Sequence, residues 1–336
     1  MHPGGRTPKQ HIRSHLRQDA ALAHDLSILL DQVAETGIAL SREIARAAFS
    51  GELGLAGDRN ATGDAQKKLD LVSNEMVVEA LAECRLVAAI ISEEMDEPMA
   101  LPAGAGAPYV VCIDPLDGSS NTDINGALGT IFGVSRRRPA PEAEPDGAVA
   151  IPRGSDLVAA GYVMYGPSTI FVYACGEGAY GFTLDHDRGE FLLTHDRLRC
   201  PERGRTYSAN LGNQKSWNAG IRAYLERVGE PDPESKRPYS LRYSGALVAD
   251  LHRILLEGGL YFYPADAKSP DGKLRLLYEC APLGYVVEQA GGRASTGTGR
   301  ILDVVPGSIH QRVPFVIGSA QEVALYESFM AQGGPS

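Results

Sequence analysis

The chain has 336 residues, a formal net charge of -10, and 43% hydrophobic and 22% charged residues. This length can bury the core of one large domain or of two packed domains, and the composition is that of globular proteins, which excludes disordered and fibrous chains. The acidic balance argues against a nucleic-acid partner, and the lack of an apolar run as long as a bilayer span argues against a membrane protein.

Residues 1–20 are polar and basic without an apolar central region, so they do not predict a secretory signal. We expect them to form a loose arm. The five cysteines are scattered, odd in number and without a Cys-x-x-Cys pair, which suits a reducing compartment. The predicted location is therefore cytoplasmic.

The first predicted elements are two helices and two buried strands. Apolar residues at spacings of three and four predict a long amphipathic helix that begins near Asp25 and runs to residue 48. A second helix is predicted over 71–84. It leads into the apolar stretch 86–91, and a second apolar stretch follows at 109–113. Both stretches predict short buried strands, and acidic residues follow each of them closely.

The middle of the chain predicts a surface loop at 137–156 and hairpin strands between 159 and 185. From about residue 200 the pattern changes to strand-helix units, with helices near 214–228, 245–257 and 281–290 and strands at 259–265 and 273–279. This order predicts a layered α/β (α+β) fold with mixed sheets between helices, in two closely packed domains, 21–199 and 200–336.

Several acidic residues lie at the ends of predicted elements. The stretch DPLDGSSN at 114–121 is a good turn by itself, because Asp and Gly favour turns and Pro ends a strand. The adjacent acids Glu93 and Glu94 repel each other at a buried strand end unless they share a cation or a proton, although a surface turn would also accept them. Contact with a helix N-terminus is the structural alternative for Glu279, and a helix cap is the alternative for Asp70.

Acidic side chains without a cluster of His or Cys predict a site for a hard cation. Carboxylate oxygens suit Mg²⁺, and paired ions of this kind hold the attacking and leaving oxygens in phosphoryl transfer. The stretch Gly118-Ser119-Ser120 adds a glycine that lets the backbone approach a ligand and successive N–H groups that point at an anion. The sequence therefore predicts a metal and phosphate site.

Four motifs resemble class I fructose-1,6-bisphosphatase: SEE at 92–94, DPLDGSSN at 114–121, RYSGALVADLHR at 242–253 and SPDGKLRLLYECAPLGYVVEQAGG at 269–292. The last two are specific to this family, whereas the DP-x-DG-S core is shared with inositol monophosphatases. The resemblance implies a two-domain sugar-phosphatase fold and a homotetramer. It also implies two or more Mg²⁺ ions per subunit, with Mn²⁺ as an alternative. The implied reaction removes the 1-phosphate from fructose 1,6-bisphosphate in gluconeogenesis or the Calvin cycle.

Carried over by position, the resemblance implies three groups of site residues. The implied metal ligands are Asp64, Glu93, Asp114, the Leu116 carbonyl, Asp117 and Glu279. Glu94 and Asp70 would orient and deprotonate the attacking water, and Gly118, Ser119 and Ser120 would hold the 1-phosphate. The implied contacts to the sugar and the 6-phosphate are Asn210, Tyr243, Tyr263, Lys273 and Arg275, and Arg242 would be donated across a subunit interface.

Two of these cations also form a pattern that does not depend on the family. Lys273 and Arg275 are two residues apart on a predicted strand, so their side chains should point the same way and grip an anion. The structural alternatives are a solvated surface charge for each cation, packing for the two tyrosines, and a turn for Asn210.

The chain departs from the family pattern where relatives bind AMP. Relatives inhibited by AMP carry a Lys-Tyr pair where this chain has Pro108-Tyr109, and Arg136 matches one other AMP contact. We therefore expect weak or absent AMP inhibition. The loop 137–156 also lacks the cysteines of thiol-regulated plant relatives.

The substrate pattern departs as well, because Leu211 and Asn213 stand where the mammalian-type pattern has an acid and a tyrosine. Sedoheptulose 1,7-bisphosphate is therefore an alternative or additional substrate. An inositol monophosphatase would not need a grip for a second phosphate. A catalytically silent, metabolite-binding homologue is the alternative from a different class.

Overall fold

The computed structural model describes residues 5–16, 19–51, 53–59, 65–104, 106–138, 149–176 and 178–332. Its α-helices are α1 (Pro8–His15), α2 (Ala20–Ser50), α3 (Lys68–Glu83), α4 (Ala219–Gly229), α5 (Leu247–Glu257), α6 (Ala281–Gln289) and α7 (Ala320–Gln332). Short 3-10 helices are η1 (Pro102–Gly104), η2 (Ser119–Ile124), η3 (Gly154–Asp156), η4 (Leu211–Ser216) and η6 (Ile301–Asp303), and η5 (Leu276–Cys280) is π-helical.

The strands fall into two mixed sheets and two small ribbons. The larger sheet has the order β10-β9-β8-β7-β6-β5-β3-β4, and the smaller one β12-β11-β13-β17-β15. The strands of the larger sheet are β3 (Val87–Ser92), β4 (Met99–Ala100), β5 (Tyr109–Asp117), β6 (Leu128–Arg136), β7 (Leu157–Tyr165), β8 (Thr169–Cys175), β9 (Ala179–Asp185) and β10 (Glu190–Leu198). Those of the smaller sheet are β11 (Thr206–Ser208), β12 (Ser240–Leu241), β13 (Leu260–Tyr263), β15 (Arg293–Ser295) and β17 (Phe315–Gly318). The ribbons pair β1 (Leu55–Arg59) with β2 (Ala65–Lys67), and β14 (Leu274–Arg275) with β16 (Arg312–Val313).

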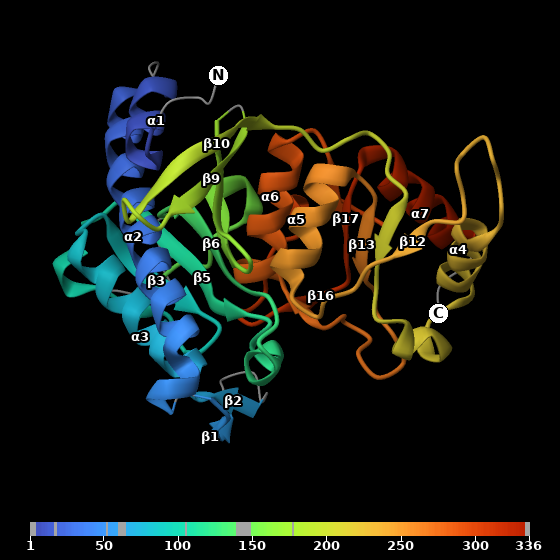
Figure 1. The fold of residues 1–336 in the computed structure, drawn as a ribbon, viewed down its shortest axis with the longest axis horizontal. Helices are drawn as coiled ribbons and strands as arrows, with labels where there is room; N and C mark the ends of the chain where they lie inside the picture. Colours follow the sequence, from blue (N-terminus) through green and yellow to red (C-terminus); the bar gives the residue numbers. More distant parts are fainter. Residues whose placement is uncertain are drawn as a thin grey trace.

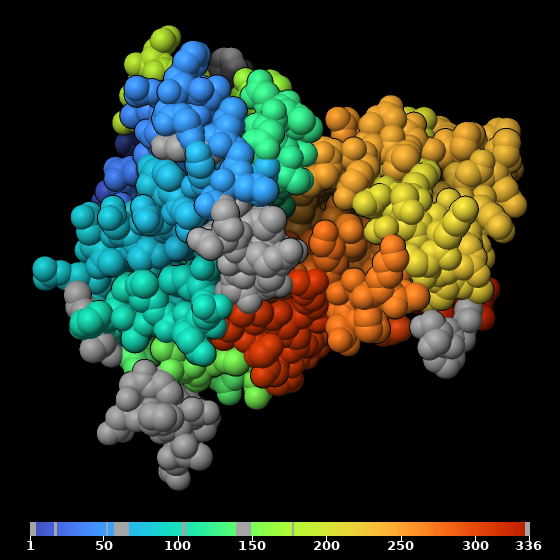
Figure 2. All heavy atoms as spheres, turned by 90° about the horizontal axis from the view of Figure 1, so that it is seen from below, coloured from blue at the N-terminus to red at the C-terminus, as the bar shows by residue number. Residues whose placement is uncertain are grey.

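Helices and sheets alternate in layers (Figure 1). Helices α1, α2 and α3 cover one face of the larger sheet, and α5 and α6 lie between its other face and the smaller sheet. Helices α4 and α7 cover the outer face of the smaller sheet. Figure 2 shows the two halves in contact, with red atoms of the C-terminal part against the N-terminal half. The predicted class, mixed sheets between helices, is confirmed.

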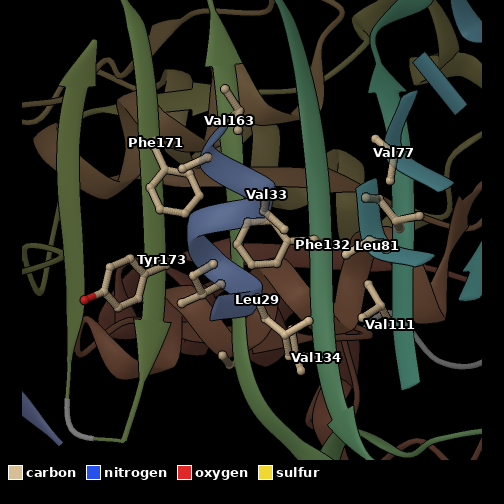
Figure 3. Packing of buried hydrophobic residues seen from close by; sticks show 14 of the residues in the cluster. Leu29, Val33, Val77, Leu81, Val111, Phe132, Val134, Val163, Phe171 and Tyr173 are labelled. Carbon is tan, nitrogen blue, oxygen red and sulfur yellow. The ribbon is translucent and has the colours of Figure 1, made fainter. Parts of the chain in front are cut away.

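The core explains why the first long helix forms where the apolar spacing predicts it. Leu29 and Val33 of α2 pack on Phe132, Phe171 and their neighbours in the larger sheet (Figure 3). These side chains are almost fully removed from water, and burial of each large apolar side chain contributes about 1.5–3 kcal/mol. The amphipathic pattern therefore holds this helix against the sheet.

The predicted loose arm at residues 1–20 is wrong for the part that the structure describes. The Thr7 side chain accepts from the Gln10 amide and caps α1. His11 is buried, and its Nδ1 lies 2.6 Å from the Tyr173 hydroxyl. The Tyr173 hydroxyl from the sheet thus gives this histidine a hydrogen-bond partner inside the molecule. Asp19 caps α2, so this helix begins at Ala20, earlier than predicted.

Two strand predictions also need correction. The strand expected at 109–113 continues to Asp117, with an irregular register between Asp114 and Asp117. The strand expected at 273–279 is β14 alone, and the apolar run after it is the π-helical turn η5, which leads directly into α6. A short apolar run fits a buried strand and a buried helical turn equally well.

None of the described helices combines the length and the apolar character that crossing a bilayer requires.

Candidate active site

The carboxylates converge because β3 and β5 are parallel neighbours. Ser92 pairs with Ile113, and the Glu93 amide donates to the Ile113 carbonyl at 3.1 Å. Glu93 is therefore beside Asp114. The Asp114 carboxylate accepts from the Leu116 amide at 3.0 Å, which fixes the irregular end of β5. Leu116 itself is buried within this segment.

Glu279 reaches the same place from the C-terminal half. It is buried in η5, and its carboxylate accepts from the Arg275 amide. Burial, and then the charges of Glu93 and Glu279 among others, raise the pKa of Asp114, so the three carboxyls share one electrostatic environment. We call Glu93, Asp114, Asp117 and Glu279 the carboxylate cluster.

Asp117 joins the two halves. Its two carboxylate oxygens accept from the amides of Leu247, at 3.2 Å, and Val248, at 2.8 Å, which are the first residues of α5. The next residue, Gly118, has φ +78°, and a Cβ there would come within 2.7 Å of the Ala246 Cβ. Glycine is therefore required at this approach, and η2 with Ser119 and Ser120 starts directly after it.

Burial and mutual repulsion raise the pKa values of the cluster. Loss of hydration, followed by the charge of Glu279, holds the pKa of Glu93 well above its ordinary range. Burial raises the pKa of Asp117 to about 6, against the opposing effect of the α5 amides. Burial raises the pKa of Glu279 to about 7. Glu93 and Glu279 are therefore at least partly protonated near neutral pH unless a cation replaces those protons.

Asp70 belongs to the same site. It is 4% exposed near the start of α3, where its Oδ2 accepts from the Lys67 amide at 2.7 Å. The cap expected as its structural alternative is therefore present. Burial raises the pKa of Asp70 to about 7, with a further contribution from Glu94, while the Ser119 hydroxyl lowers it. Asp70, Glu94 and Ser119 thus lie together. Asp64 is outside the described residues.

The predicted sugar contacts form a second group. The Lys273 ammonium is 5.9 Å from the centroid of the Tyr263 ring. Burial raises the pKa of Tyr243 to about 12, with smaller contributions from Tyr263 and Asp117, so this group adjoins the carboxylate cluster. Arg242 is exposed and donates to the Leu241 carbonyl at 2.7 Å.

Asn210 has the turn role expected as its alternative, because its Oδ1 accepts from the Gly212 amide at 3.1 Å at the start of η4. This contact keeps the Asn210 side chain at the turn that begins η4.

Arg275 differs from the expected grip. It is 3% exposed, whereas Lys273 is exposed, so the two side chains do not point the same way. The Arg275 guanidinium donates to the Lys273 carbonyl at 2.6 Å, and its charge lowers the pKa of both Glu93 and Glu279. The strand that would have aligned the two cations is only two residues long. Arg275 therefore lies with the carboxylate cluster.

The donor chemistry fits a hard cation such as Mg²⁺, because the cluster offers carboxylate oxygens in a buried setting. Over the described residues, however, no group of three or more His, Cys, Asp or Glu side chains is arranged to hold a metal ion. Both oxygens of Asp117, and one oxygen each of Asp114 and Glu279, accept from backbone amides instead. Each of these oxygens keeps a second lone pair, which remains available to an ion.

His310 and Tyr278 are two residues of this site that the sequence analysis missed. The His310 ring contacts both Tyr278 and the Met95 carbonyl, next to Glu279 and Glu94. An isolated histidine in an irregular segment carries no periodic signal, and only its spatial neighbours identify it.

Comparison with known proteins gives consistent matches over nearly the whole chain. The family model described as "Fructose-1-6-bisphosphatase, N-terminal domain" matches residues 7–196, and the corresponding C-terminal domain matches 200–331. A protein of Acaryochloris marina named "Fructose-1,6-bisphosphatase class 1 2" is 54% identical over 325 residues, covering 96% of this chain and 97% of the relative. A class 1 protein of Chlorobium chlorochromatii is 43% identical and covers the same shares of the two chains.

Solved structures agree with the sequence comparison. The holo form of Leishmania major fructose-1,6-bisphosphatase has a TM-score of 0.89 and 38% identity, covering 98% of this chain and 100% of the other. The apo form of the same protein has a TM-score of 0.84 and 35% identity, with 97% and 99% covered.

Proposed function

Because this chain belongs to the class 1 fructose-1,6-bisphosphatase family, we infer that it hydrolyses the 1-phosphate ester of D-fructose 1,6-bisphosphate to fructose 6-phosphate and inorganic phosphate. The observation that carries this inference is the carboxylate cluster, which brings Asp114 and Glu279 together from the two halves of the chain. The position of the cluster beside the start of η2 supports a role for η2 in holding the phosphate.

The expected cofactor is Mg²⁺, with two or more ions per subunit, and Mn²⁺ can use the same oxygen ligands. Glu93, Asp114, Asp117, Glu279, the Leu116 carbonyl and Asp64 are the proposed ligands. A bound ion supplies charge neutralisation on the phosphoryl oxygens and makes a water molecule easier to deprotonate.

The chain's own groups would then position and activate the water. Asp70 and Glu94 are adjacent, and a carboxyl whose pKa is about 7 can take or release a proton at neutral pH. We assign to this pair the orientation and deprotonation of the attacking water. Gly118, Ser119 and Ser120 would hold the 1-phosphate with backbone amides and hydroxyls, and the Arg275 guanidinium adds positive charge near the cluster.

Tyr243, Tyr263, Lys273 and Asn210 would bind the sugar and the 6-phosphate. The exposure of Arg242 is compatible with its donation to a neighbouring subunit of a homotetramer. The Leu211 and Asn213 positions in η4 lie next to Asn210, which keeps sedoheptulose 1,7-bisphosphate as a second substrate to be tested.

The test is phosphate release by the purified protein with Mg²⁺, from fructose 1,6-bisphosphate, sedoheptulose 1,7-bisphosphate and inositol 1-phosphate in parallel. We expect turnover of the fructose ester. Release from inositol phosphate alone, or binding of the bisphosphate without any release, would refute the proposal. Light scattering of the same preparation tests the tetramer.

A further inference from the structure

His310 connects two segments that are far apart in the sequence. The His310 Nδ1 lies 2.9 Å from the Tyr278 hydroxyl, and its Nε2 lies 3.0 Å from the Met95 carbonyl oxygen. Tyr278 directly precedes Glu279, and Met95 directly follows Glu94. One imidazole therefore joins the backbone beyond β3 to the π-helical turn of the C-terminal half.

The hydrogen-bond partners determine the tautomer of this ring. The Met95 carbonyl can only accept, so Nε2 carries the proton, and Nδ1 then accepts from the Tyr278 hydroxyl. Burial lowers the pKa of His310, which keeps the ring neutral as this arrangement requires. Both ring nitrogens have a hydrogen-bond partner, and the ring is half-buried.

The contact is built into a wider junction. Ile309 packs against a small apolar cluster that includes Ile91 of β3 together with Leu277 and Tyr278 of η5. Figure 2 shows red atoms of the C-terminal part bordering teal atoms of the N-terminal half at this side of the molecule. His310 thus lies next to the apolar cluster that Ile91 of β3 shares with Leu277 and Tyr278 of η5.

This junction opposes an electrostatic repulsion. Tyr278, which precedes Glu279, shares an apolar cluster with Ile91, two residues before Glu93. The two carboxyls are therefore held in one region, where like negative charges repel each other. Without a link between their segments, repulsion would let them separate, and a cation would then have to draw them together at a cost in binding free energy.

We propose that His310 is a positioning residue: it fixes the spacing of the carboxylate cluster and thereby sets how tightly the cluster binds a divalent cation. The inference rests on the proposed function for the identity of the cluster as a metal site. It assigns no direct contact between His310 and the substrate.

The test compares two substitutions of His310 by amide side chains of different length. His310→Gln can place an N–H near the position of Nε2 and keep the bond to Met95, whereas the shorter side chain of His310→Asn cannot. We expect His310→Asn to weaken Mn²⁺ binding by about 10- to 100-fold, the usual effect of removing a group that supports metal ligands, and His310→Gln, which keeps only the bond to Met95, to recover part of this loss. Mn²⁺ binding is measured directly, from the free-ion signal in electron paramagnetic resonance.

His252 supplies a matched control. Its Nδ1 lies 2.8 Å from the Tyr162 hydroxyl, and both His–Tyr ring pairs have centroids 5.9 Å apart in an edge arrangement. His252→Asn and His252→Gln should leave Mn²⁺ binding unchanged. In activity assays, His310→Asn should raise the half-saturating Mg²⁺ concentration while kcat at saturating Mg²⁺ and KM for the sugar ester stay close to wild type.

Wild-type Mn²⁺ affinity in a folded His310→Asn protein would overturn the proposal. If that variant does not fold, Tyr278→Phe removes the hydroxyl that donates to Nδ1, and its unchanged Mn²⁺ affinity would overturn the proposal instead. A wild-type protein that binds no Mn²⁺ would also overturn it. His310-dependent Mn²⁺ binding without phosphate release from the fructose ester would support the role of His310 while refuting the proposed function.

Discussion

Burial of Asp70 makes the free energy of unfolding depend on pH. Its pKa rises from 3.8 to about 7, because burial and then Glu94 disfavour its charge. The folded chain therefore binds this proton more tightly than the unfolded chain does. As pH rises from about 4 to about 7, the contribution of Asp70 to the free energy of unfolding declines, by about 1.4 kcal/mol for each pH unit between the two values.

Asp70→Asn should therefore become more stable relative to wild type as pH rises. The measurement is urea unfolding of both proteins at pH 5 and pH 8 in the presence of a chelator, which removes stabilisation by metal ions. The expected activity of the variant is strongly reduced. An unfolding difference that does not change between the two pH values would contradict the assignment.

Gly118 combines two requirements that can be separated by substitution. Gly118 and Gly51 both have φ near +80°, but a Cβ at Gly51 meets nothing within 4 Å, whereas at Gly118 it meets Ala246 at 2.7 Å. Gly51→Ala should cost only the left-handed backbone, about 1–2 kcal/mol. Gly118→Ala should cost more and should also lower turnover, because it displaces the start of α5. Equal losses of unfolding free energy and full activity in both variants would refute this.

At the scale of elements, Asp117 is predicted both to bind a metal ion and to cap α5. Asp117→Ala removes the acceptor of the Leu247 and Val248 amides, which should cost about 0.5–2 kcal/mol of unfolding free energy. Turnover should fall by about a hundredfold or more, comparable to the loss of a preorganised electrostatic contact.

The control for the cap is Asn218→Ala, because Asn218 accepts from the Ile221 amide at 3.0 Å at the start of α4. It should cost a similar free energy of unfolding while phosphate release stays near wild type. Near-normal turnover by Asp117→Ala would show that capping is the whole role of this carboxylate.

Elements with strong apolar periodicity were predictable from sequence, and irregular ones were not. The body of α2 from Asp25 onward and the buried strand β3 follow from spacing alone, because each buries one continuous face or run. The turn η5 was predicted as a strand, since an apolar run as short as 276–278 does not reveal its period. The start of α2 at the Asp19 cap was not predicted, because the apolar spacing used for the prediction begins only near Asp25.

For the whole molecule, the predictable part of the site is its list of carboxylates. Glu93 and Asp114 could be placed together once two buried strands were expected to end in acids. Glu279 was one more acid at the end of a predicted element, and the family resemblance implied that it binds the same metal. The burial of Arg275 beside them and the bridge through His310 depend on how η5 packs against the end of β3. Neither is encoded in local spacing, so sequence alone could not supply them.

The predicted weakness or absence of AMP inhibition also depends on packing between distant elements, where the start of α2 meets β5 and β6. The Tyr109 hydroxyl lies 3.0 Å from the Asp25 carboxylate, and the Arg136 guanidinium lies 4.0 Å from the Asp19 carboxylate. The negative charge of these carboxylates repels the phosphate of AMP. We therefore expect no AMP inhibition at micromolar concentrations in assays with the fructose ester and saturating Mg²⁺.

The variant Asp19→Asn tests this reason. It keeps a side chain that can cap α2 and removes the charge, so AMP should inhibit it more strongly than wild type. Micromolar inhibition of the wild type, or identical AMP curves for both proteins, would show that charge at this position does not exclude the nucleotide.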